Sequence, residues 1–280
     1  MKDIMCLILL GYHVHPLYRL ILIANRDEFY ARKTAPLNFW EDHPDVLGGR
    51  DLEQMGTWLG ISRSGRVAAI TNYREPEKRK INTPSRGHLV SRYLIDGDSP
   101  NAYLQHLVCH DSQYSGFNLI VGDPSGMQYR GNRSSGIVDI PAGWHSLSNH
   151  LLNTPWPKTQ NGLLALKNAC QTSNDIDIES LFKILADDTP TPDDLLPDTG
   201  IELAWERILS AIFIKSPYYG TRSSSIILID HQDYVQFWER FHPTFDSSKI
   251  RSETRYLAFK HRRSVRPQKY GFQDNHPPCP

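Results

Sequence analysis

The first residues of the chain alternate apolar runs with turn signals, as paired β-strands do. Residues 6–11 (CLILLG) and 19–24 (RLILIA) are β-compatible, and the His15-Pro16 pair between them indicates a turn. We expect these two strands to pair antiparallel, because a short connection joins them.

A polar segment separates these strands from a second predicted hairpin. Residues 25–54 are polar, contain prolines and aromatic side chains, and show no sustained period. We therefore expect a long ordered loop of the kind that carries function. Residues 57–62 and 66–73 then flank Arg63-Ser64-Gly65, a connection in which glycine permits a positive φ angle. This hairpin places Asn72 at the end of a strand.

The rest of the chain alternates groups of helices with groups of strands. Helical periodicity predicts helices at residues 86–95, 100–110, 156–170, 178–186 and 202–214. Short β-compatible runs predict strands at residues 117–121, 128–130, 137–140, 144–148, 223–230, 234–240 and 255–259. This order favours an antiparallel sheet covered by helices over repeating βαβ units.

Length and charge narrow the class of protein. A chain of 280 residues buries a large core, and we expect one domain over residues 1–260 with a basic, mobile tail over residues 261–280. Lysine plus arginine equals aspartate plus glutamate at 31 each, so no bulk charge favours nucleic acid or an acidic membrane. The apolar stretch at residues 4–10 is too short for a membrane span and lacks the features of a secretory signal. We expect a cytoplasmic protein with a small ligand.

The four cysteines are far apart and form no CxxC pair. That spacing excludes a structural zinc framework and a dense disulfide scaffold, and it predicts free thiols in a reducing compartment. Cys109 and Cys170 fall within apolar helical patterns, where cysteine usually behaves as a small buried hydrophobe. Cys6 and Cys279 call for separate interpretation.

Several short strings of the chain match a known family in order. They are ANRDEFYARKTAP, FWED, LGGRD, GTWLGISRSG and AAITNYR, followed further on by SGFNLIVGD, SLSNHLLNTPWPK and YGTRSSSIILID. On these strings the chain resembles the NRDE family, which includes the transport and Golgi organization protein 2 homologues. The near-continuous match covers residues 5–74, and Met5-Cys6-Leu7 belongs to the same pattern.

The family is similar to the N-terminal nucleophile hydrolases, so the resemblance implies an α+β fold, a four-layer αββα sandwich. In cysteine-type members, such as bile-salt hydrolases and penicillin V acylases, the first residue after processing is the nucleophile and its own α-amine is the base. A free α-amine titrates near pH 8, about the right range to accept a thiol proton. By this resemblance Cys6 matches the nucleophile, Arg26 the arginine that lowers the thiol pKa, and Asp27 the carboxylate that orients the amine.

Two features depart from those hydrolases. Their aspartate lies three residues after the arginine, whereas Asp27 follows Arg26 directly. The chain also begins Met-Lys, a start at which methionine is normally retained, and this leaves Cys6 internal without a free amine. A start at Met5 followed by removal of that methionine would expose Cys6.

Three further residues match the site of those hydrolases. Asn72 and Asn149 resemble the asparagines at the oxyanion, and Arg222 resembles a late arginine. An amide donor aimed at a developing oxyanion is worth roughly 3 kcal/mol in other hydrolases. Structural roles stay open as well, because both asparagines could satisfy backbone groups at strand ends.

Structural roles are equally open for the N-terminal candidates. Cys6 could be a buried strand residue. Arg26 and Asp27 could form a salt bridge that anchors the loop, with Glu28 solvated nearby.

The resemblance also implies haem as bound cargo, because family members are implicated in moving haem within cells. Haem needs an apolar slot and commonly an axial His, Cys, Met or Tyr ligand. The candidates here are His13, His15, His43, Tyr73 and Cys279. Arg26 is available to pair a propionate.

Aromatic side chains are frequent in the predicted loop and directly after it, and they could line a pocket for a flat or long apolar molecule or belong to the core. They are Phe29, Tyr30, Phe39, Trp40 and Trp58. The leading hypothesis is a haem-binding and haem-trafficking protein. The alternatives are a cysteine amidohydrolase that uses Cys6 and a lipid or acyl-CoA binding module with the same pocket.

Overall fold

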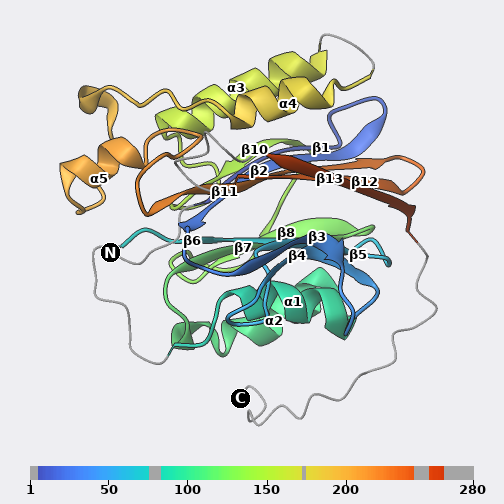
Figure 1. Ribbon diagram of the computed structural model, residues 1–280. Helices are drawn as coiled ribbons and strands as arrows, with labels where there is room; N and C mark the ends of the chain where they lie inside the picture. Colours follow the sequence, from blue (N-terminus) through green and yellow to red (C-terminus); the bar gives the residue numbers. More distant parts are fainter. Residues whose placement is uncertain (1–5, 76–82, 172–174, 243–251, 262–280) are drawn as a thin grey trace.

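The computed structural model describes residues 6–75, 83–171, 175–242 and 252–261 (Figure 1). One antiparallel sheet of six strands has the order β10 (Gly143–Leu147), β1 (Cys6–Tyr12), β2 (Tyr18–Phe29), β11 (Tyr219–Asp230), β12 (Tyr234–Phe241), β13 (Glu253–Lys260). A second, of seven strands, has the order β3 (Thr34–Phe39), β4 (Val46–Asp51), β5 (Leu59–Ser62), β6 (Val67–Asn72), β7 (Phe117–Asp123), β8 (Gly126–Gly131), β9 (Val138–Asp139).

The two sheets stack face to face, and helices cover their outer faces (Figure 1). The first sheet is covered by α3 (Pro157–Gln171) and α4 (Ile178–Leu185), with α5 (Leu203–Ile208) at its end. The second is covered by α1 (Gly87–Asp96) and α2 (Pro100–Val108). Two short 3-10 helices complete the described elements, at Asp111–Gln113 and Asp193–Leu195. The predicted four-layer αββα sandwich is confirmed.

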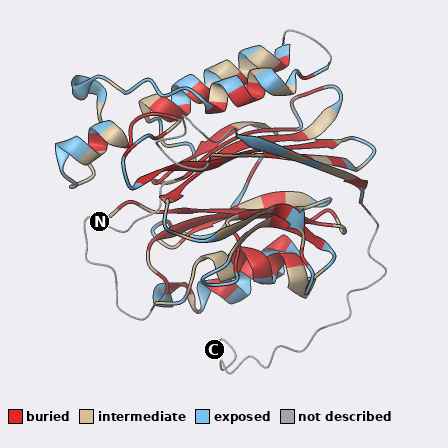
Figure 2. Cartoon of the chain, in the orientation of Figure 1, coloured by how far each residue is buried: buried red, intermediate tan, exposed pale blue. Residues whose placement is uncertain are grey.

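Alternation along β1 and β2 explains why both faces of the first sheet are buried (Figure 2). Successive side chains of a strand point to opposite faces. Ile8 and Leu22 therefore join the core between the sheets, whereas Leu9 and Ile23 pack in the core beneath α3 and α4. The predicted antiparallel pairing of β1 with β2 is confirmed, with Cys6 opposite Arg26.

The predicted loop over residues 25–54 is wrong. The strand β2 continues to Phe29, and β3 and β4 fill much of the rest. The polar side chains of the β2 extension are buried because they bond to neighbours on other strands and loops: Asn25 accepts a hydrogen bond of 2.7 Å from Ser224, and Asp27 accepts one of 2.6 Å from Thr221. The pattern indicated a loop because local polarity does not reveal such tertiary partners.

Other predicted helices and strands are present, but some begin or end at different residues than predicted. Gly65 has a φ angle of +81° in the predicted hairpin, and Asn72 ends β6. Ser99 caps α2 by accepting a hydrogen bond from the Ala102 amide. The helix predicted over residues 202–214 ends at Ile208, because later residues bond to other parts of the chain: the Ile214 amide donates to the Thr221 hydroxyl at 2.9 Å.

The cysteine prediction holds in part. Cys6 and Cys170 are free, buried thiols. Cys109 is exposed, so the expectation of a buried side chain is wrong there. It lies at the C-terminal cap of α2, beyond the face of the helix that packs on the sheet.

The described part of the chain ends at His261, the first residue of the predicted C-terminal tail. His261 is buried, and its backbone amide donates to the Asp233 carbonyl oxygen, whereas residues 262–280, including Cys279, lie outside the described residues. Within the described ranges, no helix has the length and apolar character that a membrane crossing requires.

Candidate functional site

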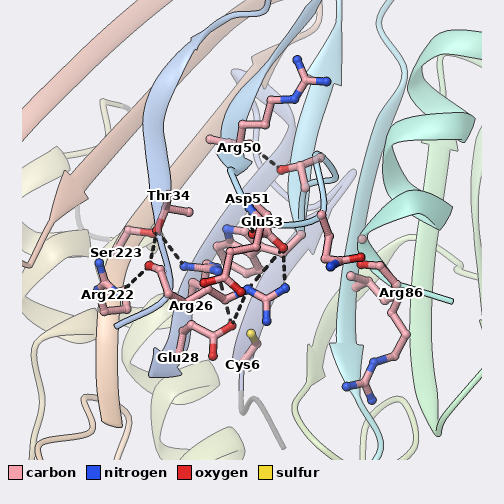
Figure 3. Close-up of a pocket in the computed structure, with 18 of the residues that line it drawn as sticks. Cys6, Arg26, Glu28, Thr34, Arg50, Asp51, Glu53, Arg86, Arg222 and Ser223 are labelled. Carbon is pink, nitrogen blue, oxygen red and sulfur yellow. Dashed lines mark hydrogen bonds and ion pairs between the residues drawn. The ribbon is translucent and has the colours of Figure 1, made fainter. Parts of the chain in front are cut away.

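A cavity of about 610 Å³ lies between the strands of the two sheets. Its walls include side chains from four strands of the six-stranded sheet, namely Cys6, Arg26, Glu28, Arg222, Ser223, Glu239 and Phe241. The seven-stranded sheet and its connections contribute Thr34, Arg50, Asp51, Trp58, Ile70 and Asn72. Figure 3 shows Cys6, Arg26, Glu28 and Asp51 gathered in the middle of this space. The structure thus brings Cys6, Arg26, Asn72 and Arg222 of the predicted site residues to one cavity.

Cys6 is both a buried strand residue and a cavity residue. It begins β1 and shares the face of Ile8, so its thiol points between the sheets toward the cavity. Its side chain is nearly covered, with the residue 2% exposed. The Ser148 hydroxyl donates to the Cys6 carbonyl oxygen at 3.1 Å, which fixes this end of the strand.

The surroundings of the Cys6 thiol oppose its ionisation. The pKa of Cys6 is raised to about 12, mainly by burial and also by the charge of Asp27. A hydrogen bond from the Asp27 backbone amide and the charge of Arg26 oppose this rise. Arg26 therefore acts on the thiol pKa in the predicted direction, but burial outweighs its effect. The thiol stays protonated at neutral pH and needs a base before it can attack.

Arg26 belongs to a buried chain of ion pairs. Its Nη2 lies 3.4 Å from Glu28 Oε2, which also lies 3.4 Å from Arg32 Nε, and Arg32 pairs with Asp51 at 2.5 Å. The expectation of a solvated Glu28 is wrong, because alternation on β2 turns Glu28 to the same buried face as Arg26. Burial raises the pKa of Glu28, and the charge of Arg26 opposes that rise. Sequence reasoning missed the roles of Glu28, Arg32 and Asp51, although the alternation of β2 would have indicated the first.

Asp27 lies on the opposite face of β2 and does not line the cavity. Burial raises its pKa to about 7, against the hydrogen bond from Thr221 and the charges of Lys158 and Arg26. Lys158 was also missed, although it ends the SLSNHLLNTPWPK string. Its Nζ is buried and donates to the Leu209 carbonyl oxygen at 2.9 Å, and burial together with Arg74 lowers its pKa to about 8. The Asp27 carboxyl and the Lys158 amine therefore lie behind the sheet that carries the thiol, and the charge of each acts on the pKa of the other.

The two candidate asparagines have different surroundings. Asn72 lines the cavity, is 6% exposed, and its Nδ2 has no hydrogen-bond partner in the part of the chain that the structure describes. Asn149 does not line the cavity. Its Nδ2 donates to the Asn72 backbone carbonyl oxygen at 3.1 Å, and its Oδ1 accepts from the Ser148 hydroxyl. The Asn72 side-chain amide is therefore an available hydrogen-bond donor, and Asn149 fixes the end of β6 at which Asn72 lies.

Arg222 lines the cavity from an irregular point of β11. The pairing of β11 with β2 shifts register between Thr221 and Ser223, so Arg222 is the extra residue of a bulge. Its Nη1 donates to three backbone carbonyl oxygens, those of Phe29 and Tyr30 at 2.9 Å and that of Arg32 at 3.2 Å. The arginine thereby holds the turn after β2.

The predicted haem ligands do not line the cavity. His13 and His15 lie at the turn between β1 and β2, at the opposite end of β1 from Cys6. The Tyr73 ring packs against His150 with centroids 5.0 Å apart, and His43 follows β3 at a partly exposed position. Cys279 lies outside the described residues. Arg26 is the one residue of that set of candidates that reaches the cavity.

Most of the aromatic side chains expected around a pocket lie elsewhere. Trp58 lines the cavity, whereas Trp40 belongs to the core beneath α1 and donates its indole N–H to the Gly48 carbonyl oxygen. Phe39 packs on the core between the sheets, and Phe29 packs edge-on against Tyr219. The cavity walls therefore carry more charged and polar side chains than the sequence predicted.

Comparison with known families decides where the chain belongs. Residues 5–243 match the family model described as Transport and Golgi organisation 2. The chain belongs to this family. Family members similar to it include the Transport and Golgi organization protein 2 homologs of Bos taurus and Homo sapiens. The first is 38% identical over 84% of this chain and 92% of its own length, and the second is 36% identical over 91% and 99%. The Drosophila melanogaster family member is 28% identical over 79% of this chain and 86% of its own.

Solved structures show a weaker likeness to this family member. A Caenorhabditis elegans ortholog of N-acylethanolamine-hydrolyzing acid amidase is 11% identical, covers 80% of this chain and 92% of its own, and has a TM-score of 0.47. Penicillin V acylase from Agrobacterium tumefaciens is 11% identical, covers 90% and 86%, and has a TM-score of 0.45. At TM-scores below 0.5 we infer nothing from either likeness.

Proposed function

We propose that this family member is a cysteine amidohydrolase in which Cys6, once it is the N-terminal residue, attacks the carbonyl carbon of an acyl amide. One observation carries the proposal: Cys6 and Asn72 line the same cavity, and the Nδ2 of Asn72 has no hydrogen-bond partner among the described residues. A nucleophile and a free amide donor are the two groups that acyl transfer requires close together.

The proposed reaction uses these two residues together with the α-amine that Cys6 would have as the N-terminal residue. The Cys6 sulfur forms a bond to the carbonyl carbon while its proton passes to the Cys6 α-amine. The carbonyl oxygen becomes an oxyanion that accepts a hydrogen bond from Asn72 Nδ2. Collapse of this intermediate breaks the C–N bond, and the α-amine returns the proton to the leaving amine. Water then hydrolyses the thioester and restores the thiol.

The free α-amine is essential because the thiol is hard to ionise. Burial raises the pKa of Cys6 to about 12, so few thiolates exist at neutral pH without a base. Five residues precede Cys6 in the sequence, and the base exists only after their removal. Asp27 and Lys158 lie behind the same strand end, where their charges act on Cys6.

Turnover of fluorogenic acyl amides of aminomethylcoumarin tests the proposal. We expect the protein that begins at Cys6 to release the fluorophore, and Cys6→Ala to abolish release. Cys170→Ala is the matched control, because Cys170 is a second free buried thiol that packs under the helices away from the cavity. Release that survives Cys6→Ala, or that is lost equally in Cys170→Ala, would rule out the mechanism.

Haem binding and trafficking is the second candidate, and the arginine side chains of the cavity support it, because guanidinium groups pair with propionates. Titration of the protein with haem should then shift the Soret band, and Arg26→Gln should weaken binding. Titration curves identical to those of free haem would exclude this candidate. The lipid or acyl-CoA module has less support, because charged side chains occupy much of the cavity wall.

A further inference from the structure

Arg222 is a buried cation whose charge has no acidic partner in the described part of the chain. The residue is 6% exposed, yet no described carboxylate lies within ion-pair distance, and its Nε has no hydrogen-bond partner. Three other cavity arginines differ, since Arg26 pairs with Glu28, Arg32 with Asp51, and Arg50 with Asp42. A buried charge is normally paired, so the cavity beside Arg222 suits an anion.

The acidic side chains of the cavity do not fill this role. Glu28 Oε1 accepts from the Phe29 amide at 2.8 Å, and its Oε2 faces Arg26 and Arg32. Glu239 Oε1 accepts from the Leu37 amide at 2.7 Å. These carboxylates already have donors, and neither forms an ion pair with Arg222, although the charge of Glu28 acts favourably on it from a longer distance. Burial lowers the pKa of Arg222 and the charge of Arg26 lowers it further, whereas Glu28 and Tyr30 oppose this fall.

The bulge in β11 supports a binding role for this side chain. Bulges often re-aim one side chain beside a functional site. Here the shift between Thr221 and Ser223 allows Arg222 and Ser223 to line the cavity together. Figure 3 shows Arg222 and Ser223 side by side at one side of the cavity, apart from Cys6.

The sheet sets the spacing between this cation and the nucleophile. Cys6 on β1 is opposite Arg26 on β2, and Arg26 is opposite Ser223 on β11. Neighbouring strands are about 4.8 Å apart, so the backbone beside Arg222 lies roughly 10 Å from that of Cys6. A ligand that reaches both residues must carry its two acceptors several bonds apart.

We infer that the ligand of this cavity carries a free carboxylate that pairs with Arg222 while its amide carbonyl lies between Cys6 and Asn72. The substrate class is thus an acyl amide with a second, anionic acid group. The amide part rests on the proposed function, whereas the carboxylate site does not.

Calorimetry with paired probes tests this inference on Cys6→Ala protein, in which turnover is blocked. The probes are monoamides of aliphatic dicarboxylic acids of increasing length, each compared with the same compound ending in a carboxamide. We expect the carboxylate form of the fitting length to bind about tenfold to a hundredfold more tightly, because a hydrogen bond to a charged group contributes that much. Equal binding of both forms at every length would overturn the inference.

Substitutions test whether the preference for the carboxylate probe depends on Arg222. Arg222→Gln in the Cys6→Ala background should abolish the carboxylate preference, and Arg207→Gln should keep it, because Arg207 is an exposed arginine paired with Asp193. If Arg222→Gln fails to fold, Arg222→Lys keeps the charge but loses the planar fork, and the preference should fall severalfold. A full preference in either variant that folds would overturn the assignment.

The two proposals fail in different ways. Cys6-dependent hydrolysis without carboxylate preference would overturn the carboxylate site and leave the amidohydrolase intact. Carboxylate preference that depends on Arg222, without hydrolysis by the protein that begins at Cys6, would support the site and remove the proposed reaction.

Discussion

At the scale of single residues, the site depends on how neighbours constrain the two asparagines. Asn72 keeps a free donor in the cavity, whereas both polar atoms of the Asn149 amide are bound to the chain. We therefore expect a catalytic role for Asn72 and a structural role for Asn149, and substitution of each residue distinguishes the two roles. A catalytic donor acts on the rate, whereas a buried structural amide acts on stability.

Asn72→Ala should lower kcat on an acyl amide by about a hundredfold to a thousandfold, because the oxyanion loses its donor. Asn149→Ala should instead lower the free energy of unfolding by about 1 to 3 kcal/mol, because the Asn72 carbonyl and the Ser148 hydroxyl lose their buried partner. Steady-state kinetics and urea unfolding of both variants provide the measurements. A kcat for Asn72→Ala within a few-fold of the unchanged protein would exclude it as the oxyanion donor.

At the scale of elements, β2 presents charged side chains on both of its faces, toward the cavity on one and toward the helices on the other. Arg26 and Glu28 face the cavity, whereas Asp27 faces the helices, where Thr221 donates to it and Lys158 lies in electrostatic range. Burial of the Asp27 carboxyl raises its pKa and so makes the stability of the fold depend on pH. Because its pKa is about 7 in the folded chain and about 4 when unfolded, the folded state binds the proton more tightly.

The contribution of Asp27 to the free energy of unfolding should therefore fall as pH rises from about 4 to about 7, because over this range the unfolded state has lost the proton that the folded state still holds. Asp27→Asn should flatten this decline, because an amide keeps the hydrogen bond with Thr221 and does not titrate. Asp188→Asn is the control: Asp188 is exposed, and its hydrogen bond with Lys215 lowers its pKa, so its titration lies below this range. Urea midpoints across the range give the measurement, and an unchanged slope in Asp27→Asn would contradict the account.

At the scale of the whole molecule, the sequence predicted the layers and half of the site. Apolar runs at β1 and the first half of β2, and the glycine of the β5–β6 hairpin, are local signals that needed no tertiary information. The polar end of β2 was unpredictable because its burial depends on Ser224 and Thr221, which lie 199 and 194 residues further along the chain than their partners Asn25 and Asp27. Family resemblance supplied Cys6, Asn72 and Arg222, but the bulge that turns Arg222 to the cavity required the fold.

The most direct test of the central claim is the intact mass of the protein produced from its own gene and start region. The account predicts a mass that begins at Cys6, because the buried thiol then has its own amine as base. A mass that retains Met1 or Met5 in protein that still cleaves acyl amides would contradict the account, because catalysis would then proceed without the free α-amine.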